Sequence, residues 1–227
     1  MTVFLLCVGG VIVVGWVCFT LLIQVMFGRP STEAGDGEPL PVLPVSDDAG
    51  VLRQLRVSGG AYWRPIAWCE QGEGGDEVKG IMYEVCAVLG EELDIPVKFV
   101  CHPWARAVNE ARKGNVDVLA GAYWSSEREA FFAYSEPVLT DNICVFVKKV
   151  QAFALDQWDD LKGRVGGRFR SGSYGEAFDR FAEAHLQQEV VKTHEQLFGK
   201  LTSGRNDYAI IAYLDGLANL SRLGLEQ

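Results

Sequence analysis

The sequence predicts an α/β fold with a largely parallel sheet, divided into two similar halves. From Val51 onward, apolar stretches of strand length alternate with stretches whose apolar residues recur at helical spacing. Two junctions, Gly114–Asp117 and Gly204–Asp207, share one order: a helix, a glycine that ends it, an aspartate three residues later and an apolar strand. Two ordinary helix-to-strand turns would look the same, but one junction falls in each half, which favours two similar lobes.

The individual elements follow from the same periodicities. We expect strands at residues 52–57, 97–101, 116–120, 143–147, 164–168 and 208–211, and helices near residues 81–89, 104–111, 174–184 and 197–201. Lys148 and Lys149 follow the fourth strand. We place the boundary there, with the first lobe at residues 51–146 and the second at residues 147–227.

An uncharged segment precedes the folded part. Residues 3–27 contain no Asp, Glu, Lys or Arg, and a helix of about 20 apolar residues spans a bilayer. We therefore expect residues 1–28 to form a transmembrane anchor or a signal segment. No basic residue precedes the segment and no small-x-small cleavage site stands out, which favours the anchor. Residues 29–50 are rich in acidic residues and proline, which predicts an extended linker.

Charge and motif content exclude several function classes. The net charge of -9 argues against a nucleic-acid partner, which would be bound through clustered Lys and Arg. The six cysteines include no CxxC pair, so a zinc site is not expected. His102, His185 and His194 lie outside any catalytic motif. We expect no metal, no cofactor and no enzymatic activity.

Motifs of the first lobe, in chain order, resemble those of one family. They are Gly80–Val85, Trp104–Ala107, Lys113–Asp117, Ser125–Arg128 and Tyr134–Pro137. The run resembles the first lobe of the family 3 extracellular solute-binding proteins, the polar amino-acid binders of ABC importers, with Ser125–Arg128 similar to its Thr-Pro-Glu-Arg motif. The resemblance implies a two-lobed, type II periplasmic-binding-protein-like fold that closes on a ligand by a hinge motion.

The second lobe resembles the same family over shorter motifs. Leu161–Gly166 resembles its opening strand, Ser171–Tyr174 its Gly-Thr/Ser loop and Gly204–Ala212 its late helix-to-strand turn. Family members continue with a strand that returns to the first lobe and a closing helix. We therefore expect the second lobe to be incomplete.

The resemblance also implies a ligand site. Arg128 matches the arginine that binds the ligand's carboxylate, for which a planar guanidinium is suited. Backbone N–H groups near Ser125, Gly172 and Ser173 are expected to add anion contacts. Tyr62, Trp63 and Tyr123 are expected to stack on the ligand, together with Trp124.

Each of these residues has a simpler interpretation. Arg128 could be a surface or ion-paired residue, Tyr62 and Trp63 could be core or rim aromatics, and Ser173 could cap a helix. The sequence also departs from the family. Ala212 stands where the family often has the Asp that binds the ligand's ammonium group, so the amino end of recognition is expected to be lost.

The predicted function is extracytoplasmic binding of a small carboxylate such as an amino acid for an ABC permease, on the periplasmic side of the inner membrane. The alternatives are a membrane-anchored sensor domain and, less favoured, a cyclic-acid dehydratase using Glu136 or Asp141. Among the cysteines of an exported domain, Cys86 and Cys101 could pair, and buried free thiols are the alternative.

Overall fold

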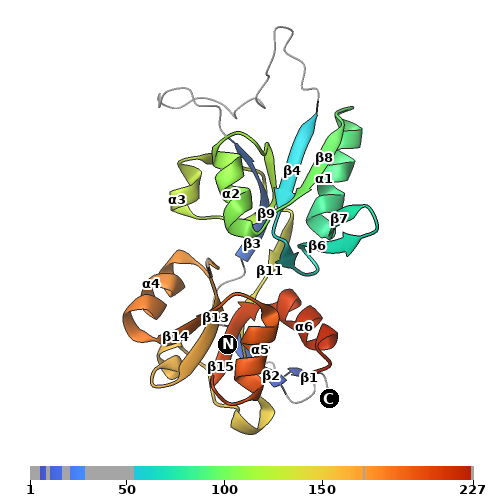
Figure 1. Cartoon of the computed structure of the whole chain (residues 1–227). Coiled ribbons are helices and arrows are strands. Elements are labelled where there is room, and N and C mark those ends of the chain that lie inside the picture. The colour runs from blue at the N-terminus through green and yellow to red at the C-terminus, as the bar shows by residue number, and fades with distance from the viewer. Residues whose placement is uncertain (1–5, 9–10, 17–20, 29–53, 171, 226–227) are drawn as a thin grey trace. The chain divides into compact units, whose positions relative to one another are not determined.

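The computed structural model describes residues 6–8, 11–16, 21–28, 54–170 and 172–225 (Figure 1). The chain divides into two compact units. We call Leu22–Leu139 the first lobe, and Thr140–Gln227 together with Met1–Leu21 the second lobe. The expected linker at residues 29–50 lies outside the described residues.

The first lobe is built on a mixed sheet in the order β10-β3-β9-β4-β8. β4 is parallel to β8 and β9, whereas β3 is antiparallel to β9 and β10. The strands are β3 (Leu21–Gly28), β4 (Leu55–Gly59), β8 (Val97–Cys101), β9 (Val118–Tyr123) and β10 (Phe132–Tyr134). The helices are α1 (Ile81–Glu92), α2 (Trp104–Arg112) and α3 (Ser126–Glu129). A separate antiparallel sheet, not predicted from the sequence, contains β5 (Tyr62–Trp63), β6 (Ala67–Gly72) and β7 (Gly75–Lys79).

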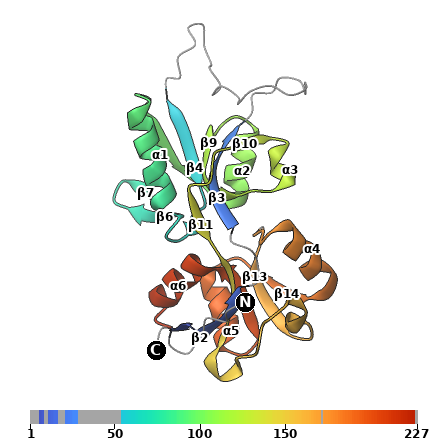
Figure 2. The ribbon, with the colours of Figure 1, turned by 180° about the vertical axis from the view of Figure 1, so that it is seen from behind.

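The second lobe has a sheet in the order β1-β2-β12-β15-β13-β14. β13 is parallel to β14 and β15, and β12 is antiparallel to β15 and β2. The strands are β1 (Leu6–Val8), β2 (Val11–Trp16), β12 (Ile143–Lys148), β13 (Val165–Phe169), β14 (Gln187–Val191) and β15 (Tyr208–Ala212), and β11 (Leu139–Asp141) leads from the first lobe into the second. The helices are α4 (Glu176–His185), α5 (His194–Thr202) and α6 (Tyr213–Arg222), with 3-10 turns η1 (Lys149–Gln151) and η2 (Trp158–Leu161). Figure 2 shows the ribbon from behind.

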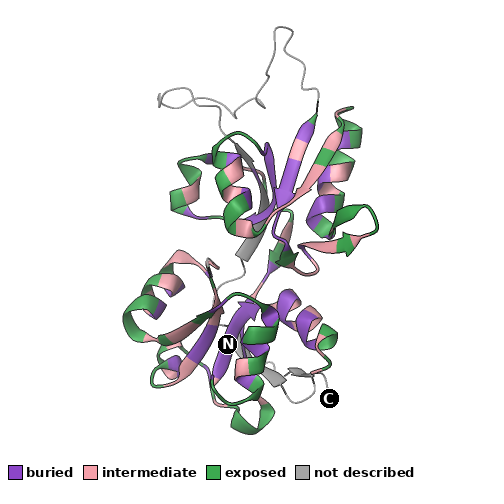
Figure 3. Ribbon diagram, in the orientation of Figure 1, coloured by how far each residue is buried: buried purple, intermediate pink, exposed green. Residues whose placement is uncertain are grey.

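Both sheets are buried at their centres. All five residues of β15 are buried, as are five of the six residues of β9, whereas the helices alternate buried and exposed positions (Figure 3). Phe146 of β12 and Phe198 of α5 pack edge to face in the second core. This pattern is typical of strands covered by amphipathic helices. It confirms the predicted α/β fold, whereas both sheets are mixed and not largely parallel as expected.

The two predicted Gly–Asp junctions are structurally equivalent. Gly114 and Gly204 follow α2 and α5 with φ of 75° and 77°, a conformation that glycine adopts without steric cost. Asp117 Oδ2 accepts a hydrogen bond from the backbone N–H of Arg56, and Asp207 Oδ2 accepts one from that of Val165, both at 2.8 Å. In each lobe the aspartate therefore joins the start of one parallel strand to its neighbour.

The N-terminal segment differs from the prediction. The described residues between 6 and 28 form β1, β2 and β3 rather than one apolar helix. Among the residues that the structure describes, no helix is long and apolar enough to cross a bilayer. The discrepancy has a physical cause, because a continuous apolar run is compatible with a buried strand as well as a helix, and Val11–Val14 is β-branched throughout.

The first lobe contains a disulfide, and its partners differ from the possible pair named from the sequence. Cys101 of β8 is bonded to Cys69 of β6, and Cys86 is a buried free thiol. Burial raises the pKa of Cys86 to about 12, so this thiol is unreactive at neutral pH. The possible pairing of Cys86 with Cys101 is therefore not found, and for Cys86 the alternative of a buried free thiol is confirmed. Connectivity cannot be deduced from cysteine spacing, and Cys86 lies on the core face of α1.

Candidate functional site

Arg128 is held at the start of a short helix in the first lobe. Its backbone N–H donates to Ser125 Oγ, so the Ser125 hydroxyl caps α3. Its Nη1 donates to the carbonyl of Tyr123 at 3.1 Å, and its guanidinium carbon lies 5.4 Å from the ring centroid of Trp104. Among the described residues Arg128 forms no ion pair, and its Nε and Nη2 have no hydrogen-bond partner. The side chain is thus oriented by the protein and keeps donors for an anion.

Aromatic side chains lie at the carboxyl end of β9, next to this arginine. The rings of Trp63 and Tyr123 are 5.1 Å apart in an edge-to-face arrangement. Tyr62 is 64% exposed and Trp124 is 48% exposed. The structure therefore brings Trp63, Tyr123 and the α3 residues together within the first lobe.

Gly121 explains the position of the Trp63 ring. Its φ is +89°, which disfavours any residue with a Cβ. A Cβ built there would lie 3.1 Å from Met82 Cγ and 3.3 Å from Trp63 Cζ3. The indole of Trp63 therefore packs close to the backbone of Gly121, where a side chain would crowd it.

The predicted anion loop of the second lobe binds a carboxylate of the chain itself. Ser173 Oγ donates to Asp179 Oδ2 at 2.8 Å, and the backbone N–H of Tyr174 donates to the same oxygen at 3.1 Å. Arg168 Nη2 pairs with Asp179 Oδ1 at 3.2 Å and donates to the carbonyl of Gly172 at 2.6 Å. The N–H of Gly172 donates to Phe169. In this structure, Gly172 and Ser173 are therefore engaged internally.

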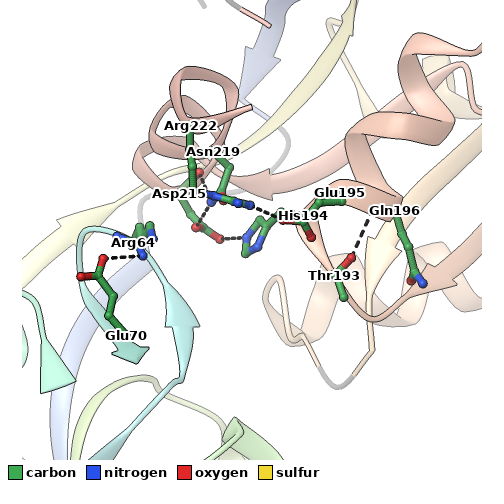
Figure 4. A network of polar contacts seen from close by, with 9 residues as sticks. All are labelled: Arg64, Glu70, Thr193, His194, Glu195, Gln196, Asp215, Asn219 and Arg222. Atoms are coloured by element: carbon green, nitrogen blue, oxygen red, sulfur yellow. Dashed lines mark hydrogen bonds and ion pairs between the residues drawn. The ribbon is translucent and has the colours of Figure 1, made fainter. Parts of the chain in front are cut away.

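A buried polar cluster in the second lobe was not identified from the sequence. His194 Nε2 lies 2.9 Å from Asp215 Oδ2, and Asn219 Nδ2 donates to Asp215 Oδ1 at 2.8 Å (Figure 4). The ring of Phe169 packs 4.6 Å from that of His194. His194 and Asp215 are the first and third residues of their helices, which begin just after β14 and at the end of β15. Both residues follow a predicted strand, and this position could have marked them as candidates. Their contact could not be predicted, because 21 residues separate them in the sequence.

Asp141 lies beside this cluster. Its Oδ1 accepts hydrogen bonds from the backbone N–H groups of Asn142 at 2.8 Å and Leu214 at 3.5 Å. Its Oδ2 is buried and has no hydrogen-bond partner within the described part of the chain. Burial, with a smaller contribution from the charge of Asp215, raises the pKa of Asp141 to about 6.

Comparisons with solved structures show a periplasmic-binding-protein-like fold. A histidine kinase sensor domain with similarity to periplasmic binding proteins is 22% identical, with 76% of this chain and 74% of that chain covered and a TM-score of 0.67. An amino-acid ABC transporter substrate-binding protein from Streptococcus pneumoniae, bound to L-arginine, is 19% identical, with 74% and 71% covered and a TM-score of 0.63. An ancestral amino-acid-binding protein, described as a precursor of cyclohexadienyl dehydratase, is 22% identical, with 74% of each chain covered and a TM-score of 0.63.

The comparison with curated proteins found no match. The family model described as bacterial extracellular solute-binding proteins, family 3, matches residues 55–204, which confirms the resemblance found in the sequence motifs. This range contains every residue of the candidate site discussed above except Leu214, Asp215 and Asn219. The chain belongs to the bacterial extracellular solute-binding proteins of family 3.

Proposed function

We propose that this protein is an extracytoplasmic solute-binding protein that captures a small carboxylate-bearing solute, such as an amino acid, for an ABC importer. The observation that carries the proposal is Arg128, a guanidinium fixed by the Tyr123 carbonyl with Nε and Nη2 left without partners among the described residues. The neighbouring rings of Trp63 and Tyr123 suit the apolar part of a ligand. The Cys69–Cys101 disulfide agrees with an oxidising compartment.

The charge-removing substitution Arg128→Ala tests this assignment. Hydrogen bonds to charged groups contribute about 1.5–3 kcal/mol each, so we expect a loss of affinity of about 10-fold to 100-fold for a carboxylate ligand, with the fold retained. A thermal-shift screen of amino acids and amine-free carboxylates identifies the ligand, because binding to the folded state raises the melting temperature. Calorimetry on both proteins then gives the affinities.

Arg112→Ala is the matched control. Arg112 is another guanidinium of the first lobe, and it pairs with the exposed carboxylate of Glu127. We expect this variant to bind as the wild type does. Unchanged affinity in Arg128→Ala, or an equal loss in both variants, would exclude Arg128 from the site.

A ligand-sensing domain is the second candidate function. The similarity to a histidine kinase sensor domain supports it, since that protein shares this fold. The two functions make the same demands on the ligand site and differ in the partner, an ABC permease or a signalling protein. Co-purification from membranes with ligand present distinguishes them.

Membrane attachment through residues 1–28 stays a prediction. Strands β2 and β3 lie in the sheets of the two lobes, where they would not be available to a bilayer. Alkaline extraction of membranes distinguishes the two arrangements. Retention of the protein in the membrane supports the anchor, and release supports the strands.

A further inference from the structure

Helix α1 of the first lobe carries apolar side chains on both of its faces. Its inward face is buried and includes Met82 and Cys86. On its outward face Ile81 is 41%, Val88 55% and Leu89 38% exposed. These three residues recur at i, i+7 and i+8, so they lie along one side of the helix. A helix that is apolar all round is typically covered on both sides.

The apolar surface continues past the end of the helix. Leu93 follows the last residue of α1 and is 52% exposed. We call Ile81, Val88, Leu89 and Leu93 the α1 patch. Exposed positions run along α1 in Figure 3. Within the described ranges no other helix of the chain exposes a large apolar side chain, so the α1 patch is not a general property of this surface.

The charged residues of α1 are all acidic. The helix contains Glu84, Glu91 and Glu92, which are exposed, and it contains no Lys or Arg. None of these carboxylates forms an ion pair with a residue that the structure describes. Lys79, which precedes the helix by two residues, is paired with Glu70. The α1 patch is therefore bordered by negative charge that the first lobe does not neutralise.

This border decides which occupant the α1 patch fits. A second copy of the chain would bring the same carboxylates to a two-fold contact, and an anionic bilayer would bring phosphates. Residues 29–50 carry several acidic residues against the single basic residue Arg29. Each of these three occupants places like charges side by side, which opposes binding.

We propose that the α1 patch is a docking surface for a partner protein, whose contact segment has apolar residues bordered by Lys or Arg. An exposed apolar patch with a polar border is typical of protein–protein interaction sites. The α1 patch shares no residue with the candidate ligand site. The inference therefore adds a partner surface to the proposed function and does not rest on it.

The test uses two defined peptides. The first is a helical peptide of Leu and Lys, with Leu at i, i+3, i+4 and i+7, and the second has Glu in place of every Lys. Fluorescence anisotropy of the labelled peptides, titrated with the full chain, gives the two affinities. We expect the Lys peptide to bind at least about 10-fold more tightly than the Glu peptide. Equal affinities, or no binding of the Lys peptide, would overturn the inference.

Val88→Gln locates the binding on α1. Replacing an exposed valine by a neutral polar residue leaves the charge of the helix unchanged, and the fold is expected to persist. We expect about 10-fold weaker binding of the Lys peptide, because the valine is no longer buried by it. Val190→Gln is the matched control, since Val190 of β14 in the second lobe is 56% exposed. An equal loss in both variants would contradict binding at α1.

The double variant Glu84→Gln/Glu91→Gln tests the acidic border. We expect about 5-fold weaker binding of the Lys peptide, as exposed ion pairs contribute little each. The control Glu73→Gln/Glu183→Gln changes the net charge equally at exposed glutamates outside α1. If both double variants lose the same affinity, the overall charge of the chain and not α1 attracts the peptide, and the inference fails.

The other occupants give distinct results. Three measurements cover them: a peptide of residues 37–46 that binds as tightly as the Lys peptide, a dimer in sedimentation that Val88→Gln dissociates, and anionic vesicles that bind the wild type but not Val88→Gln. Any of these would overturn the inference. Arg128→Ala is expected to bind the Lys peptide as the wild type does, so failure of the α1 patch and failure of carboxylate capture are told apart.

Discussion

The two lobes share an α/β plan but differ in the polar side chains near the ends of their strands. In the first lobe the ends of the strands carry a guanidinium with open donors and aromatic rings, as Arg128 and Trp63 show. In the second lobe they carry carboxylates, of which Asp179 and Asp215 are paired internally and Asp141 is not. The repeated topology therefore places side chains at corresponding strand ends in each lobe, and the residue types that follow each strand decide what chemistry stands there.

The largest expected difference between the lobes comes from the disulfide, which lies in the first lobe alone among the described cysteines. Cys69 and Cys101 are 32 residues apart, and a bridge of that span contributes about 3.7 kcal/mol. We expect the double variant Cys69→Ser/Cys101→Ser to lower the free energy of unfolding of the first lobe by that amount, measured by urea denaturation. Reductant should reproduce the loss in the wild type and have no effect on the variant. Identical midpoints with and without reductant would contradict the bridge.

The two equivalent Gly–Asp junctions give a second, smaller contrast. Asp117 accepts from the backbone N–H, Nε and Nη2 of Arg56, whereas the side chain of Asp207 accepts from the backbone N–H of Val165. We expect Asp117→Ala to cost about 2–3 kcal/mol and Asp207→Ala about 1 kcal/mol, because the first also leaves a guanidinium unpaired. Denaturant midpoints of both variants check this order, with Asp117→Asn as the isosteric control. Equal losses of stability would mean that the bonds from the Arg56 side chain to Asp117 do not stabilise the folded state.

These junctions show what the sequence could predict. Local signals, a glycine after a helix and an apolar run after an aspartate, placed α2, α5, β9 and β15 close to their observed bounds. The Ser125 cap of α3 is equally local, because capping acts over three residues, although we expected Ser125 only to add an anion contact.

Features that depend on long-range contacts could not be predicted in this way. The Cys69–Cys101 pair depends on how the β5–β7 sheet folds onto β8, which spacing does not encode. The loop at Ser173 is held by a hydrogen bond from Ser173 Oγ to Asp179, which lies in the first turn of α4. Sequence patterns do not show this contact. Ala212 suggested that recognition of an amino group was lost, and that expectation stays a prediction.

The smallest expected effect is the contribution of Asp141 to the stability of the ligand-free protein. Most carboxyl groups stabilise the folded state as pH rises, whereas this one destabilises it. Because the folded-state pKa is about 6, above the unfolded value of about 3.9, the folded state holds a proton between these values that the unfolded state has released. Stability from this group is therefore present below about pH 4 and is lost as pH rises through 6. The carboxylate then lowers the free energy of unfolding at neutral pH.

Asp141→Asn removes that pH-dependent penalty. The gain is offset in part, because an amide is a weaker acceptor for the N–H groups of Asn142 and Leu214 and loses the favourable charge at the start of α6. We expect a net stabilisation of about 1 kcal/mol at pH 7.5 that disappears near pH 4. The neighbouring ionisable side chains are Asp215 from α6 and His194 from α5. Melting curves of both proteins across this range give the difference. A variant less stable than the wild type at pH 7.5 would mean that Oδ2 already has a partner in the free protein, and the contrast between an open acceptor in the second lobe and open donors in the first would no longer hold.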